Sequence, residues 1–162
     1  MSTEQANYQR GEYLLERYRT YRQCAGKDAL PLQTCLAVLR ILSYGLSRHD
    51  RFLAQDQELL DTAGPLLVHA VEHLAQIIRE MPGPFTKLSY CVLFERFLNL
   101  DWTPADETEL LAKMEKDGFK MTLEELRRYE MLGISVFASL AFQLPEQSAL
   151  LYAEKMKTEL PG

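Results

Sequence analysis

Several well-marked functional motifs are missing from this chain of 162 residues. No segment alternates apolar and polar residues between hairpin turn signals, so the sequence predicts no β-strand. The GxxxxGK[ST] and GxGxxG loops that cradle phosphates are absent, and so is the GxSxG elbow of serine hydrolases. These absences argue against the common classes of nucleotide-binding and hydrolytic enzymes, and they favour a non-enzymatic protein.

Cysteine is scarce, and long apolar runs are lacking. The three cysteines show no C-x-x-C spacing, and an odd number of thiols is typical of a reducing compartment. The longest apolar run, residues 131–144, falls short of the roughly 20 residues that span a bilayer. The first residues are polar, without the apolar core of a signal peptide. We therefore expect a soluble protein of the cytoplasm, or of the nucleus.

Acidic residues outnumber basic ones, and this balance bears on whether the chain binds nucleic acid. The chain carries 18 Lys and Arg against 23 Asp and Glu, a formal net charge of −5. Binding to nucleic acid needs clustered cations against the phosphates, so this balance argues against a general nucleic-acid binder. A chain of this length can bury a sufficient core without a disulfide or metal. We expect a single domain of residues 1–162 that needs no cofactor.

Apolar residues recur with helical periodicity in almost every segment of the chain, and glycine and proline mark the expected helix ends. The expected helices cover about residues 4–24, 31–45, 51–62, 65–81, 85–100, 104–117, 122–144 and 146–160. Thr103 is the expected N-cap of the sixth, and the fifth is apolar enough to be buried on most of its surface. The sequence thus predicts an all-α domain of seven to eight helices, either an irregular bundle or a short stack of helical hairpins.

The segment 122–144 is the strongest indication of how these helices pack. Thr122 and Glu125 form a capping-box pattern at its start, and from Met131 onward almost every residue is apolar. A helix that is apolar on all sides must be enclosed by others, so we expect this one at the centre of the domain. Its small residues mark sites of close approach, where large substitutions should unfold the domain: Gly133, Ser135, Ala138, Ser139 and Ala141.

A metal site is one alternative. Residues 69–73 read His-Ala-Val-Glu-His and match the H-x-x-E-H pattern of inverted zincins, with His69 and His73 as ligands and Glu72 as the base. Such a site would need a third protein ligand, such as Glu146 or Glu154; a non-catalytic metal site that uses His49 as well is a separate alternative. The competing interpretation places both histidines on a solvent-facing helix edge, and under it the segment binds no metal.

The first helix offers a different candidate site, because tyrosine and arginine alternate along it. Residues 10–27 carry five basic and two acidic side chains. Tyr and Arg are enriched at protein–protein hot spots, since they combine a large contact area with polar groups. We therefore predict that a partner protein contacts Tyr13, Arg17, Tyr18 and Tyr21. Alternatively, the tyrosines pack this helix onto the bundle while the arginines extend into water.

Two segments resemble parts of a cyclin box. Residues 121–126, Met-Thr-Leu-Glu-Glu-Leu, together with 136–137 and 140–145, are similar to that family's fifth helix, and 94–98 to the end of its third. The charged interval 101–120 departs from the family, whose fourth helix is apolar. The resemblance implies a regulatory subunit of another enzyme, as a second alternative to an adaptor or scaffold module.

Overall fold

The computed structural model describes residues 3–25, 46 and 50–142, and helices are the only regular secondary structure in this part of the chain. It contains five α-helices and one π-helical turn: α1 (Thr3–Ala25), α3 (Ala54–Glu80), α4 (Pro84–Leu93), η1 (Phe94–Leu98), α5 (Glu107–Lys116) and α6 (Leu123–Phe142). The all-α prediction is confirmed, and no strand occurs in these residues. The count of seven to eight helices is not supported: the described residues form five α-helices. The expected helices at 31–45 and 146–160 lie outside these residues.

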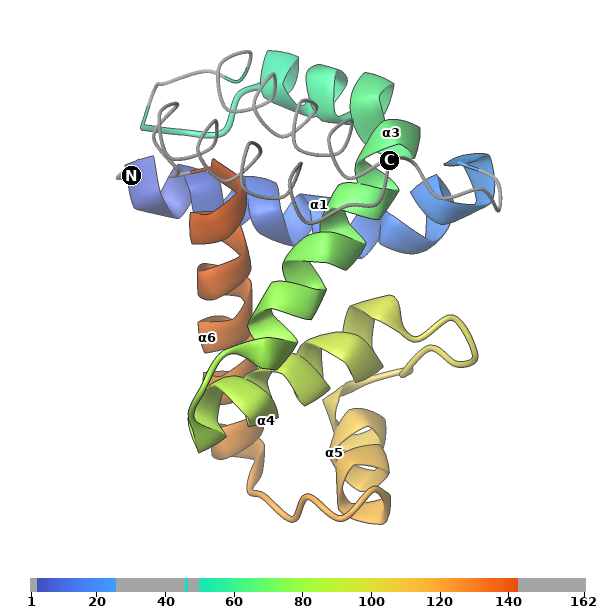
Figure 1. Cartoon of the computed structure of the whole chain (residues 1–162), viewed down its shortest axis with the longest axis vertical. Helices are drawn as coiled ribbons and strands as arrows, with labels where there is room; N and C mark the ends of the chain where they lie inside the picture. The colour runs from blue at the N-terminus through green and yellow to red at the C-terminus, as the bar shows by residue number, and fades with distance from the viewer. Residues whose placement is uncertain (1–2, 26–45, 47–49, 143–162) are drawn as a thin grey trace, which may run out of the picture.

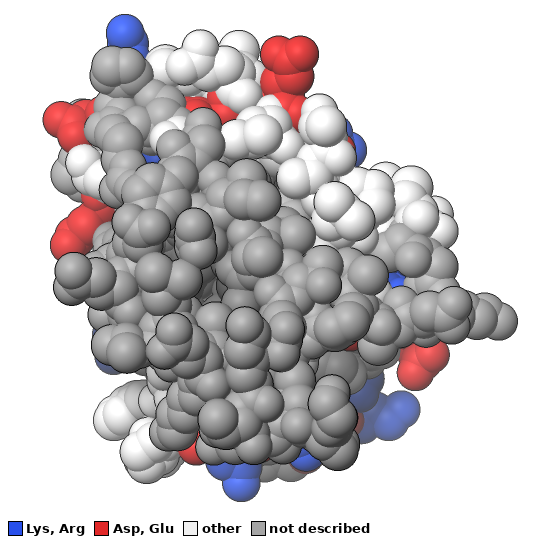
Figure 2. Space-filling model, turned by 45° about the horizontal axis from the view of Figure 1, so that its top comes forward, with Lys and Arg blue, Asp and Glu red and all other residues white. Residues whose placement is uncertain are grey.

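The helices cross one another at steep angles around a shared core (Figure 1). α1 lies under the first half of α3, and α6 runs from α4 up to α1. Each of these helices contributes fully buried side chains, among them Leu14, Leu67, Ile134 and Phe137. A second, smaller cluster joins α4, α5 and the start of α6. Charged side chains of both signs are scattered around the margin of the face shown in Figure 2.

One continuous helix, α3, replaces the two that were predicted at 51–62 and 65–81. Pro65 was expected to start the second helix, but it lies inside α3. A proline in a helix interior has no N–H to donate to the carbonyl four residues earlier, and it bends the helix without necessarily ending it. The axis of α3 accordingly changes direction along its length (Figure 1). Its first half therefore packs with α1, and its end reaches α4.

α6 confirms the predicted start of the 122–144 helix but not its complete burial. The Thr122 N–H donates to Glu125 Oε1 and the Glu125 N–H to Thr122 Oγ1, both at 3.1 Å, which is a complete capping box. Met131 and Leu132, however, are 57% and 40% exposed. The prediction of a central helix buried on nearly every side is thus wrong for this turn, because the helices that pack on α6 cover only part of its circumference.

Close approach at the small residues of α6 occurs at some of the predicted positions. A Cβ added at Gly133 would lie 2.8 Å from Leu93 Cγ, and one added at Gly11 would lie 3.0 Å from Ala138 Cβ. Ala141 is buried as well, whereas Ser139 is exposed. The helices α1 and α4 therefore touch α6 at Ala138 and Gly133, and Ser139 faces solvent.

The Pro82-Gly83-Pro84 stop ends α3 as expected, but two later boundaries differ. α5 begins at Glu107 with Asp106 as its N-cap, whose carboxylate accepts the Glu109 N–H at 2.8 Å, so the assignment of Thr103 as N-cap is wrong. The predicted helix 85–100 is α4 followed by η1, in which the Asn99 N–H donates to Phe94 O at 2.7 Å. No described helix is long and apolar enough to cross a membrane.

Candidate functional site

The structure places two of the four predicted contact residues inside the α1–α3 interface. Tyr18 and Tyr21 are 4% and 6% exposed, so their rings pack the helices together. The Tyr18 hydroxyl donates to Glu72 Oε1 at 2.6 Å, and burial together with this bond raises the pKa of Tyr18. The Tyr21 hydroxyl donates to Asp61 Oδ1 at 3.1 Å. The packing alternative given by the sequence describes these two tyrosines.

The other two predicted residues reach the surface. Tyr13 is half-buried and donates its hydroxyl to Asp61, which thus accepts from two tyrosines of α1. Arg17 is exposed, and its guanidinium lies 5.5 Å from the centre of the Tyr13 ring. Of the four predicted residues, Arg17 and part of Tyr13 are therefore accessible to a partner in the described structure.

The arginines of α1 do not all extend into water, as the packing alternative assumed. Arg10 is 1% exposed and pairs with Asp56 at 2.9 Å. Arg19 donates to the backbone carbonyls of Arg96, Asn99 and Trp102 at 3.2, 2.8 and 2.9 Å. Partial burial lowers the pKa of Arg19. These two arginines hold the fold together, and Arg19 fixes the loop that follows η1.

Replacing Arg19 with alanine is expected to lower the free energy of unfolding by about 1.5 kcal/mol, because hydrogen bonds from a charged donor are lost while water can reach part of the site. The measurement is urea unfolding of the purified protein. Arg17→Ala is the matched control, since its guanidinium is exposed on the same helix. Equal stability of the two variants would contradict the role of Arg19.

The histidine motif on α3 is also partly buried. His69 is 4% exposed, so the interpretation of a solvent-facing edge is wrong at this residue. Glu72 accepts from Tyr18 and pairs with Arg22 at 3.3 Å, so its carboxylate is already engaged. Burial lowers the pKa of His73.

The predicted metal residues do not assemble a metal site in the part of the chain that the structure describes, although His69 Nδ1 lies 3.8 Å from Glu72 Oε2. Among these residues, no group of three or more His, Cys, Asp or Glu side chains could hold a metal ion. His49, Glu146 and Glu154 lie outside the described residues.

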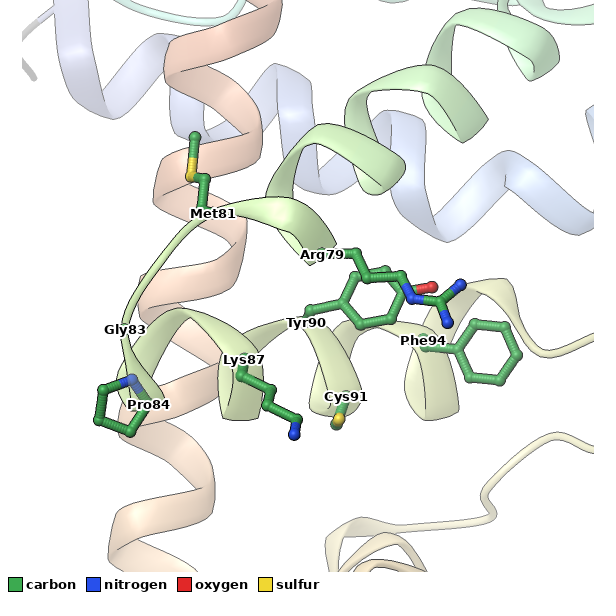
Figure 3. Close-up of a pocket in the computed structure, with 8 residues that line it drawn as sticks. All are labelled: Arg79, Met81, Gly83, Pro84, Lys87, Tyr90, Cys91 and Phe94. Atoms are coloured by element: carbon green, nitrogen blue, oxygen red, sulfur yellow. The ribbon is translucent and has the colours of Figure 1, made fainter.

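An open groove on α4 is the feature that the sequence did not reveal. It has a volume of about 730 Å³, and it is lined from the end of α3 and along α4 by Arg79, Met81, Gly83, Pro84, Lys87, Tyr90, Cys91 and Phe94. In Figure 3, Lys87 and Cys91 point to the same side of α4, and the Arg79 guanidinium extends toward Phe94. Phe94 remains 36% exposed although its ring stacks on Tyr90, with centroids 6.2 Å apart.

Exposure along α4 corrects the expectation that helix 85–100 is buried on most of its surface. Phe85 is 63% exposed, and the groove residues form a second uncovered side. The nearly continuous apolar sequence of this helix did not indicate which side chains are exposed, because periodicity cannot distinguish two apolar faces of one helix. In the sequence, Arg79 and Lys87 are merely two cations near an apolar run, and nothing in that pattern shows that they line one groove.

The groove combines an apolar surface with two cations that have no carboxylate partner in the part of the chain that the structure describes. Within the described ranges, neither Arg79 nor Lys87 forms an ion pair. Burial raises the pKa of Tyr90, and the nearby charge of Arg79 opposes that shift. Burial also raises the pKa of Cys91, which makes its thiol a poor nucleophile near neutral pH. The groove is suited to binding rather than to covalent catalysis.

Comparison of the chain with known protein families, with curated proteins and with solved structures found no match. The site must therefore be interpreted from its own chemistry.

Proposed function

We propose that this chain is a non-enzymatic helical module, an adaptor or scaffold, that binds a partner protein inside the cell. The observation that carries the proposal is the α4 groove, where Tyr90 and Phe94 present aromatic surface beside two cations that form no ion pair with any described residue. A few hot-spot residues carry most of the binding energy at protein interfaces, and Trp, Tyr and Arg are enriched among them. Phe85, which is 63% exposed, is a further large apolar side chain at the surface, on a different side of α4 from the groove.

The metal-binding alternative has less support. A ligand or base at position 72 would have to release the hydrogen bond from Tyr18 and the ion pair with Arg22. Regulation of another enzyme, which the cyclin resemblance implies, remains a prediction and would be one form of the same partner binding.

Replacing Phe94 with glutamate is expected to reduce recovery of the partner protein by about tenfold or more, because a charge replaces a central aromatic contact. The measurement is quantitative affinity purification of the intact tagged chain from its native cells, followed by mass spectrometry. Leu66→Glu is the matched control, since Leu66 is 50% exposed and does not line the groove.

The same comparison separates the two candidate surfaces. Arg17→Glu tests the α1 face, and a loss with this variant alone would place the contact there. The proposal is wrong if no protein is enriched at near-stoichiometric amounts over a tag-only sample. Circular dichroism must show that each variant retains its helical content and its thermal transition.

A further inference from the structure

We infer that the occupant of the α4 groove is an acidic amphipathic helix of the partner protein, with apolar anchors on one side and Asp or Glu flanking them. This inference rests on the proposed function and adds the chemistry of the partner. It follows from the shape, the apolar lining and the charge of the groove.

The shape of the groove suits a helix. Pro84, Lys87, Cys91 and Phe94 are three, four and three residues apart, so they follow one side of α4 over nearly three turns. Arg79 at the end of α3 and Met81 directly after that helix line the groove from the other side. An elongated groove between two helices with an apolar lining is the usual receptor for an amphipathic helix, which inserts side chains spaced three or four residues apart.

The walls are held in place by the rest of the fold. The side of α4 opposite the groove packs on α6, where Leu93 lies against Gly133 and Val92 is fully buried. Phe94 starts the π-helical turn, and its carbonyl accepts the Asn99 N–H at 2.7 Å. π-Turns of this kind occur frequently at functional sites. The groove is thus formed before binding, so a partner need not order it.

The charges at the groove favour an acidic occupant. The acidic groups near Cys91 are already engaged: Glu95 Oε2 accepts the Trp102 indole N–H at 2.5 Å, and Asp117 binds Lys113 at 2.8 Å. Arg79 and Lys87 have no such partner among the described residues. The chain is acidic overall, but charges beyond about 8 Å are largely screened at physiological salt. The two cations at the groove therefore determine which charge of ligand binds there.

The test is a selection from a displayed library of helical peptides of about 16 residues, roughly four turns. Leucine is fixed at positions spaced alternately three and four residues apart, so that the leucines lie on one side of the helix. The flanking positions are randomised among Glu, Lys, Gln and Ala. Peptides selected on the full chain are expected to be enriched in Glu. In fluorescence polarisation, Phe94→Ala should raise their Kd by about tenfold or more, and Lys87→Glu by about three- to tenfold.

Charge exchange gives the decisive comparison. The Arg79→Glu, Lys87→Glu double variant is expected to prefer the Lys version of a selected peptide over the Glu version. Lys116→Glu is the matched control, because Lys116 is exposed on α5 and outside the groove. Selection of Lys-rich or uncharged peptides, or of none that depend on Phe94, would overturn the inference.

Two outcomes separate this inference from the proposed function. If Phe94→Glu abolishes recovery of the cellular partner but no acidic peptide binds, the module proposal stands and the acidic-helix inference is wrong. If sedimentation shows a dimer of the chain that Phe94→Ala dissociates, the groove is an interface between copies, and the inference is overturned as well.

Discussion

Replacing Asp56 with alanine is expected to lower the free energy of unfolding by about 3–5 kcal/mol, since it removes the carboxylate from a fully buried ion pair. The side chains of Arg10 and Asp56 are 2% and 1% exposed, and their atoms Nη2 and Oδ2 are 2.9 Å apart. Asp56 Oδ2 also accepts the Leu53 N–H at 3.0 Å, at the start of α3. Such a loss is a large part of the 5–15 kcal/mol that stabilises a typical domain, and urea unfolding measures it directly.

The double variant Arg10→Met, Asp56→Leu is the control. Removing both charges leaves no uncompensated ion in the core, so this protein should be markedly more stable than Asp56→Ala. A loss below about 1 kcal/mol for Asp56→Ala would mean that water reaches the pair, contrary to its burial.

Replacing Gly64 with alanine is expected to cost about 3 kcal/mol, although alanine normally gains about 1 kcal/mol over glycine inside a helix. A Cβ at this position would lie 2.5 Å from Cδ1 and 2.6 Å from Cζ of Tyr21. The ring is held in the core and by its bond to Asp61, so it cannot move aside easily. Overpacking therefore outweighs helix propensity, and the expected result is a lower midpoint of thermal or urea unfolding.

A double-mutant cycle tests the cause of this loss. In a Tyr21→Leu background, Gly64→Ala should be nearly neutral, because the ring atoms that it would meet are gone. If Gly64→Ala costs the same in both backgrounds, the damage arises elsewhere in α3, for example from a change in the bend near Pro65.

The sequence predicted local features of the fold well. The first helix was expected at 4–24 and is observed at Thr3–Ala25, and the capping box of Thr122 and Glu125 is present. Both depend on residues that are neighbours in the chain. Predictions failed where distant contacts decide the outcome: α3 continues through Pro65, because packing on both halves of the helix outweighs one missing hydrogen bond.

The candidate site was less predictable for the same reason. Composition alone cannot show that Tyr18 and Arg10 face α3 while Arg17 faces solvent, since all three occur in one alternating pattern. The groove depends on the angle between α3 and α4, and on which cations lack a partner. These properties follow from the packing of whole helices, so no local pattern indicates them.

The contacts of α1 also determine when this helix can become stable during synthesis. Its hydrogen bonds to Asp56 and Glu72 join residues 46 and 54 positions apart, and those of Arg19 reach 77 to 83 positions ahead. Many helical proteins fold quickly because their contacts are local, whereas closure of such long loops slows folding. α1 emerges from the ribosome before α3, the loop after η1 and α6, and it lacks these packing partners until they have followed. Its apolar face therefore remains exposed to chaperones and to aggregation during that interval.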